Sequence, residues 1–348
     1  MKNRRLALLS VLLWVVGSAF AAEYPAREWA MHDRQGWSEP LLAAARKYAS
    51  NQKTLAVIVV QNGRVVDQWG PVDQKILVRS VRKSFLSALY GIHLAEGRIN
   101  LGMTLGELGI DDHPPALTAI EKQATILDLL RSRSGVYHET NSETKSARAA
   151  RPSRGSHPPG SFFYYNNWDF NALGAIFQQV TGANIFEDFE KRIARPIGMN
   201  DFTAADGRLS LEPEGSNLKG DSKFPHYMFS MTARDMARFG YLFLRNGKWG
   251  DRQIVPAEWV ARSTTPYSTL RFEDGYGKQS GYAMLWWTED WGYMALGQGG
   301  HVIAVVPGKD LVIVHRVVYD PPREDIMDFR QIEPLIRMYI DAAPDIRR

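Results

Sequence analysis

Apolar runs near both ends of the chain have the alternation and the turn residues of β-strands. Residues 54–69 contain two such runs joined by Asn62-Gly63, a dipeptide that favours the tight type I′ turn of a β-hairpin. Further strand-like runs occupy 282–287, 293–297, 301–307 and 310–318. The pattern therefore predicts a sheet whose strands come from the two ends of the chain.

Other apolar positions recur at the spacing of amphipathic helices. Helices are predicted over 40–50 and, in the middle of the chain, over 125–131, 168–180 and 233–245, joined by long polar loops. A further helix opens at Ser80. Its buried side is Phe85, Leu86, Leu89 and Ile92, with Leu94 as a further candidate, and Gly97 is its stop signal. The last helix carries Ile326, Phe329, Leu335, Ile336 and Tyr339, with Pro334 as a kink or a break.

This order of elements predicts an α+β fold, an antiparallel sheet flanked by helices with an inserted helical lobe. We place the α/β lobe at about 38–79 and 255–348, and the helical lobe at about 80–254. A mature chain that begins at residue 22 is long enough to bury a large core.

The first 21 residues have the features of a secretory signal peptide. Lys2, Arg4 and Arg5 precede an apolar run over 6–16, and Ala19-Phe20-Ala21 is a small-residue cleavage site. Cleavage removes three positive charges and no negative ones, so the formal net charge of +4 becomes 4 − 3 = +1. We expect a periplasmic or secreted bacterial protein with no stable membrane anchor after cleavage, and nothing in its charge indicates a nucleic-acid partner.

The composition excludes several kinds of chemistry. The chain has no cysteine, which rules out disulfides, thiol catalysis and cysteine-ligated zinc. It has no His-Glu-x-x-His motif and no pair of histidines at ligand spacing, so we expect neither a metal nor a cofactor. Of the eight histidines, His138 and His301 are the two with any functional interest, and no pattern indicates an oligomeric state.

A serine and a lysine one helical turn apart are the first candidate for catalysis. Ser80 and Lys83 share a helix face, so the lysine can act as the base that a serine nucleophile needs. Ser-x-x-Lys also occurs at Ser50, Ser142 and Ser216, but only Ser80 opens an amphipathic helix. The alternative is that Ser80 is an N-cap and Lys83 a solvated side chain of the first turn.

Two further segments carry candidate site residues. Tyr165 and Asn167 precede a predicted helix, where a tyrosine can relay a proton and an asparagine can hold a substrate carbonyl or the lysine. The alternative is a core tyrosine and a helix cap at Asn167. Glycines at 297, 299 and 300 indicate either close approach of a substrate to an edge strand or a tight turn around Gln298.

With these segments together, the chain resembles the serine β-lactamase and penicillin-recognising superfamily, in particular its class C-like branch of esterases and 6-aminohexanoate-dimer hydrolases. That superfamily has Ser-x-x-Lys, then Tyr-x-Asn, then Lys/His-x-Gly. The corresponding segments are Ser80-Val81-Arg82-Lys83, Tyr165-Asn166-Asn167 and Gln298-Gly299-Gly300. The resemblance covers essentially the whole mature chain.

The resemblance implies a site between an α/β lobe and a helical lobe. Ser80 would be acylated, Lys83 and Tyr165 would share the general base and acid roles, and Asn167 would orient the substrate. The backbone N–H groups of Ser80 and His301 would form the oxyanion hole. A lysine acts as a base near neutral pH only where burial or neighbouring charge lowers its pKa.

The chain departs from the superfamily at Gln298, where β-lactamases and penicillin-binding proteins usually have a cation. A β-lactam carboxylate would lose its charge partner unless His301, Arg151 or Arg154 replaces it. We therefore expect hydrolysis of a small-molecule ester or amide rather than of a β-lactam. The alternatives are a DD-peptidase or β-lactamase, and a non-catalytic binding protein with the same fold.

A cluster of aromatic residues near the predicted strand ends is either the wall of a substrate pocket or part of the core. Its members are Trp286, Trp287, Trp291 and Tyr293.

Overall fold

The computed structural model describes residues 24–26, 28–213, 217–270, 280–317 and 329–345. The predicted signal peptide and Ile326 lie outside these residues. Within them, no helix combines the length and the apolar character that a bilayer crossing requires.

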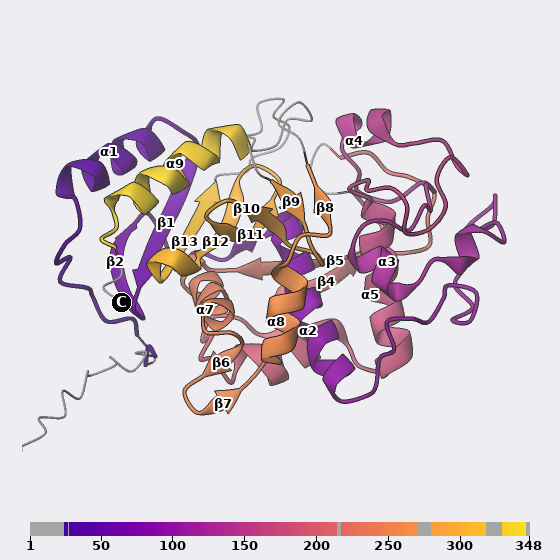
Figure 1. The fold of residues 1–348 in the computed structure, drawn as a ribbon, viewed down its shortest axis with the longest axis horizontal. Coiled ribbons are helices and arrows are strands. Elements are labelled where there is room, and N and C mark those ends of the chain that lie inside the picture. The colour runs from indigo at the N-terminus through magenta and orange to yellow at the C-terminus, as the bar shows by residue number, and fades with distance from the viewer. Residues whose placement is uncertain (1–23, 27, 214–216, 271–279, 318–328, 346–348) are drawn as a thin grey trace, which may run out of the picture.

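The core of the fold is one antiparallel sheet built from the two ends of the chain, as the sequence predicts (Figure 1). Its strand order is β2-β1-β13-β12-β11-β10-β9-β8. The strands are β1 (Thr54–Gln61), β2 (Arg64–Trp69), β8 (Ser268–Thr269), β9 (Gly281–Tyr282), β10 (Trp287–Glu289), β11 (Gly292–Gly297), β12 (His301–Val306) and β13 (Leu311–Val317). All six residues of β12 and all seven of β13 are buried, because helices cover both faces of the sheet at this point.

The hairpin between β1 and β2 has the predicted turn. Asn62 and Gly63 both adopt positive φ, 51° and 72°, which is what a type I′ turn demands of its two central residues. The strand expected over 282–287 is wrong, because the chain turns inside it. Leu285 has φ 65° and Ala283 N–H donates to the Trp286 carbonyl, so the run divides between β9 and β10.

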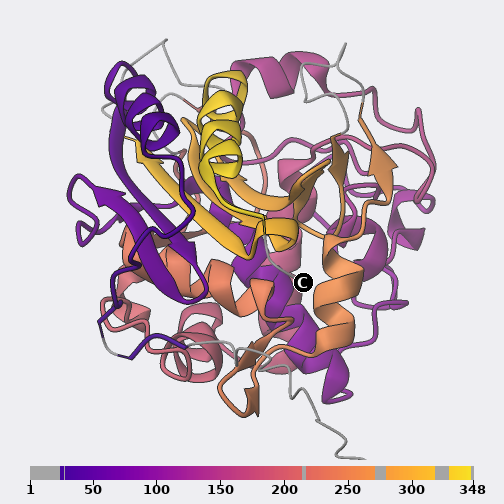
Figure 2. The ribbon, with the colours of Figure 1, turned by 60° about the vertical axis from the view of Figure 1, so that its left-hand side comes forward.

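Helices from the two chain ends lie side by side on one face of the sheet. These are α1 (Glu39–Ser50) and α9 (Phe329–Ala342), and Figures 1 and 2 both show them adjacent. Pro334 lies inside α9 and does not end it. On the other face, α7 (Ala233–Leu244) packs against β1, β12 and β13. A Cβ at Gly240 would lie 2.6 Å from Ile303 and from Val312, so this close packing requires glycine.

The remaining elements form the helix-rich part of the molecule around a central helix. This helix, α2 (Arg82–Ala95), is buried at every residue from Arg82 to His93. The lobe boundaries at residues 80 and 254 stay a prediction. The other elements are α3 (Ile126–Leu130), α4 (Lys145–Ala150), α5 (Asn167–Thr181), α6 (Ile185–Phe189), α8 (Ala257–Thr264), β3 (Ile76–Leu77), β4 (Gly207–Ser210), β5 (His226–Met231), β6 (Lys248–Trp249) and β7 (Arg252–Gln253).

Candidate active site

Ser80 lies in a 3₁₀ turn, Arg79–Val81, that leads directly into α2. The α-helix therefore begins two residues later than expected, and its N-cap position is Val81 rather than Ser80. The first N–H groups of such a helical run have no acceptor inside the run, which leaves the Ser80 N–H at the positive end of the helix dipole. The N-cap interpretation of Ser80 is excluded.

Lys83 is the centre of the site. Its side chain is buried at 2% exposure, so it is not a solvated first-turn residue. Its Nζ donates to Ser80 Oγ at 3.0 Å, to the Tyr165 hydroxyl at 2.6 Å and to Asn167 Oδ1 at 2.9 Å. The amine also lies 4.2 Å from the centre of the Phe170 ring. The structure thus brings together the four residues that the first two motifs predict, from segments 82 to 84 residues apart along the chain.

A buried polar network fixes the segment that carries Tyr165 and Asn167. Asn166, not Asn167, is the N-cap of α5, and its Oδ1 accepts from the Trp168 N–H. The other end of the Asn166 amide donates to the Val136 carbonyl at 2.6 Å and to Asp169 Oδ1 at 2.8 Å. Because Asn166 makes these inward contacts, Asn167 and Tyr165 are left to bind Lys83.

The Tyr165 ring is held by aromatic neighbours. Its centre lies 5.2 Å from that of Trp287 and 5.9 Å from that of Tyr282. Of the aromatic residues that the sequence marked near the strand ends, Trp287 is therefore beside the site. Trp286 and Tyr293 pack edge to face on each other and are core. Tyr282 was missed, because only the long-range fold places it next to Tyr165.

The glycine-rich segment forms a tight turn that packs against the nucleophile segment. Gly297 ends β11 and pairs with His301, and residues 298–300 connect the two strands. Gly299 and Gly300 have φ of 87° and 96°, values that glycine adopts without strain. A Cβ at Gly297 would lie 2.6 Å from the carbonyl oxygen of Val78, two residues before Ser80. The tight turn is therefore present. The close approach seen here is that of the Val78 carbonyl, and the approach of a substrate to this strand stays a prediction.

The peptide plane at this turn decides which N–H faces the site. Gly300 N–H donates to the Gly297 carbonyl, which therefore points toward β12. In a trans peptide unit the next N–H points the opposite way, so the Gln298 N–H points away from β12. The ladder between β10 and β11 stops at Met294, so this side of β11 beyond Met294 has no ladder partner among the described strands. The geometry favours the Gln298 N–H over the His301 N–H as the second oxyanion donor.

The three side chains considered as replacements for the cation each lack a charge or have a protein partner. Gln298 Nε2 donates to Asn217 Oδ1 at 3.2 Å. His301 is buried, and burial followed by the charge of Arg316 holds its pKa well below the usual range, so its ring is neutral near pH 7. Arg151 donates to the His138 carbonyl, and Arg154 forms an ion pair with Glu121. Of the three candidate substitutes, one is therefore uncharged near pH 7 and the other two already have protein partners, Arg151 also lying 3.8 Å from the Glu143 carboxylate.

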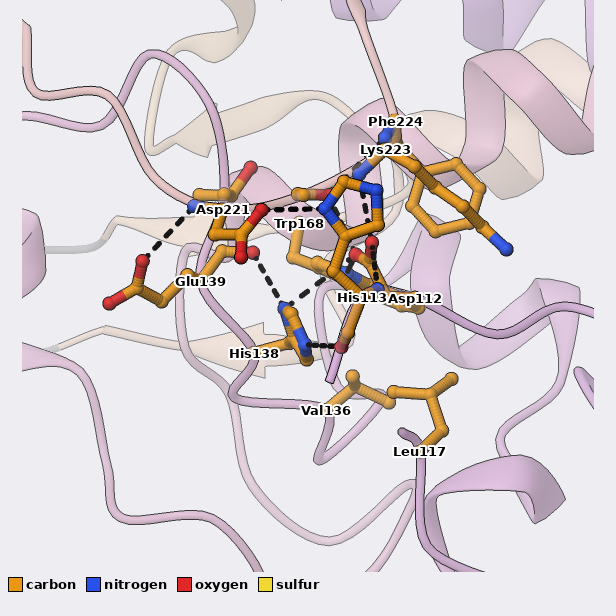
Figure 3. A network of polar contacts seen from close by, with 12 residues as sticks. Asp112, His113, Leu117, Val136, His138, Glu139, Trp168, Asp221, Lys223 and Phe224 are labelled. Atoms are coloured by element: carbon orange, nitrogen blue, oxygen red, sulfur yellow. Dashed lines mark hydrogen bonds and ion pairs between the residues drawn. The ribbon is translucent and has the colours of Figure 1, made fainter. Parts of the chain in front are cut away.

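His138 belongs to a polar network beside the site rather than to the catalytic group (Figure 3). Its two ring nitrogens face the carbonyl oxygens of His113 and Glu139, each at 3.0 Å. The adjacent Asp112 carboxylate accepts from the Trp168 indole N–H at 2.7 Å. Because Trp168 follows Asn167 in α5, this network helps to fix the start of that helix.

Comparisons with known proteins agree with this geometry. The sequence model of the beta-lactamase family matches residues 42–333. This chain belongs to the beta-lactamase family. It is 24% identical over 292 residues to the 6-aminohexanoate-dimer hydrolase of Paenarthrobacter ureafaciens, which covers 75% of this chain and 71% of the relative.

Solved structures of the beta-lactamase-like fold superpose on most of the chain. A candidate 6-aminohexanoate-dimer hydrolase from Bacillus anthracis has a TM-score of 0.64 and 22% identity, covering 92% of this chain and 87% of its own. A penicillin-binding protein homologue from Caulobacter crescentus has a TM-score of 0.61 and 14% identity. The match covers 90% of this chain and 99% of the homologue. The predicted fold class is confirmed.

Proposed function

We propose that this protein is a secreted serine hydrolase that cleaves an ester or amide bond through an acyl-enzyme on Ser80. The observation that supports this proposal best is the buried amine of Lys83, which contacts Ser80 Oγ and the Tyr165 hydroxyl at once. A serine hydroxyl becomes a competent nucleophile when a base lies within hydrogen-bond reach.

The proposed reaction has two halves. Ser80 Oγ attacks the carbonyl carbon while its proton passes to the Lys83–Tyr165 pair, which returns it to the departing alcohol or amine. Water then attacks the acyl-enzyme, with the same pair taking its proton and restoring the Ser80 hydroxyl. In both halves the negative carbonyl oxygen is stabilised by the N–H groups of Ser80 and Gln298, and loss of one such donor typically lowers kcat by about 10²–10³.

The neutral side chain at 298 supports a substrate without a carboxylate at that position. The similarity to a 6-aminohexanoate-dimer hydrolase supports a linear amide as one substrate class. We expect Gln298→Lys to raise the acylation rate by a fluorescent penicillin about 10-fold or more, because a hydrogen bond to a charged group contributes about 1.5–3 kcal/mol. Gln298→Met is the matched neutral control. Equal rates in both variants would contradict this account of selectivity.

The proposal is tested first by kinetics. Ser80→Ala is expected to abolish turnover of p-nitrophenyl butyrate and of a linear 6-aminohexanoate dimer. Wild-type rates in that variant would exclude the mechanism. Inertness of the folded wild type toward a broad ester and amide panel, together with ligand-induced thermal stabilisation, would instead indicate a binding protein.

Secretion is a separate part of the proposal with its own measurement. The mature protein recovered from the periplasm or medium of a bacterial host should have the mass of a chain that begins at residue 22. A retained, uncleaved N-terminus would contradict it.

A further inference from the structure

A buried arginine lies behind the proposed site. Arg316, on β13, has 1% of its surface exposed. Every acceptor that its guanidinium reaches among the described residues is uncharged. These acceptors are His301 Nδ1 at 3.2 Å, the Met231 carbonyl at 2.8 Å, Met236 Sδ at 2.8 Å, the Ile76 carbonyl at 2.8 Å and the Leu77 carbonyl at 3.2 Å.

Such a placement is costly for stability. A charge removed from water without an opposite charge beside it is destabilising, and here burial lowers the pKa of Arg316 to about 9. Arg245, a partly buried arginine that directly follows α7, instead forms an ion pair with Asp310, which precedes β13 at the end of that strand opposite Arg316. An apolar side chain would fill the space at Arg316 at lower cost, so the polar contacts themselves suggest a role.

These contacts join the two segments that carry the proposed oxyanion donors. Ile76 and Leu77 form β3, and Leu77 lies three residues before Ser80. His301 starts β12 and pairs with Gly297, whose carbonyl shares a peptide unit with the Gln298 N–H. The Arg316 guanidinium therefore connects the segment leading to Ser80 with the β11–β12 hairpin, whose turn begins at Gln298.

The neighbouring residue on β13 holds the same hairpin from the opposite face of the strand. His315 Nδ1 donates to the Gly300 carbonyl at 2.6 Å, and its Nε2 accepts from the Thr54 hydroxyl at 2.9 Å. Successive side chains of a strand point to opposite faces, so Arg316 and His315 together hold the turn from both sides.

We propose that Arg316, supported by His315, is a positioning residue that sets the distance between the Ser80 N–H and the Gln298 N–H. Arg316 does not touch the substrate. It acts through Leu77 and His301, whose positions it fixes. This inference rests on the proposed function, because it assigns a second layer of residues to the same oxyanion hole.

The test compares Arg316→Met and Arg316→Lys with the control Arg245→Met, which removes the arginine paired with Asp310 at the opposite end of β13. We expect Arg316→Met to lower kcat for p-nitrophenyl butyrate about 100-fold while KM changes less than about threefold, since misplacing a catalytic donor by about 1 Å costs about this much. The rate of acylation by a fluorophosphonate should fall in parallel, and Arg316→Lys should recover part of both. Arg245→Met should lower the melting temperature and leave kcat within about twofold.

Three results would overturn the inference. One is an Arg316→Met enzyme with wild-type kcat. Another is a loss of kcat in Arg245→Met as large as that in Arg316→Met at matched melting temperature, which would indicate a general effect of stability. If Arg316→Met does not fold, the His315→Leu variant is measured in its place. Wild-type kcat in His315→Leu would then be the third result that overturns the inference. Absence of Ser80 labelling in the wild type would instead refute the proposed function, so the two failures are distinguishable.

Discussion

Removing one hydroxyl from the site should separate catalysis from stability. Tyr165→Phe deletes the oxygen that lies 2.6 Å from Lys83 Nζ and keeps the aromatic ring. Lys83 retains its contacts to Ser80 and Asn167, and the ring retains its packing against Trp287. We therefore expect the nucleophile to stay in place and the proton relay to be lost.

The expected loss follows from the role assigned to that oxygen. General acid–base catalysis by a positioned group contributes about 10²–10⁴ in rate. Because the Lys83 amine remains as a partial substitute, we expect kcat for p-nitrophenyl butyrate to fall about 10²–10³-fold, equivalent to about 3–4 kcal/mol in the barrier. The melting temperature should change by only a few degrees, because few packing contacts are lost.

The neighbouring tyrosine provides a matched control. The Tyr164 hydroxyl donates to the Ala147 carbonyl at 2.8 Å and to Glu143 Oε1 at 3.3 Å, and neither partner belongs to the group around Lys83. Tyr164→Phe should keep wild-type kcat. Equal kcat losses in the two variants, or wild-type kcat in Tyr165→Phe, would refute the relay.

Two more predictions concern the sheet. Burial raises the pKa of the Glu289 carboxyl to about 7. Its proton is held more tightly in the folded state, so this contribution to stability is complete below about pH 4.5 and is lost as pH rises through 7. Between pH 5 and pH 8, urea unfolding should show the wild type losing up to about 2.7 kcal/mol more than Glu289→Gln, because the interval from pH 5 to pH 7 spans about 2 pH units at 1.36 kcal/mol each. Identical losses in the two proteins would contradict the assignment. Gly297→Ala places a Cβ 2.6 Å from the Val78 carbonyl, so it should lower kcat at least about 10-fold with the protein still folded, and an unaffected kcat would show that the hairpin can move without consequence.

The parts of the site that the sequence predicted are those fixed by local geometry. Ser80 and Lys83 meet because three residues along a helical run return to the same face. The Asn62-Gly63 turn was predictable because its φ values select those two residues. The sheet followed from apolar runs at both chain ends.

The features that could not be predicted from the sequence depend on contacts between distant segments of the chain. Nothing local distinguishes Asn166 from Asn167, and the choice of cap follows from the Val136 carbonyl, 30 residues earlier. Leu285 interrupts an apolar run with a positive φ, which leucine rarely adopts. Arg316 lies 239 and 240 residues from the carbonyls it binds, so no pattern along the chain could reveal its partners.

The most direct test of the account is to locate a covalent adduct on the intact chain. Wild-type protein treated with a fluorophosphonate should gain one adduct mass, and peptide mapping should place it on Ser80. The Ser80→Ala protein should gain none. An adduct on another residue, or an equal mass gain in the variant, would contradict the claim that the Lys83 amine activates Ser80 as the nucleophile.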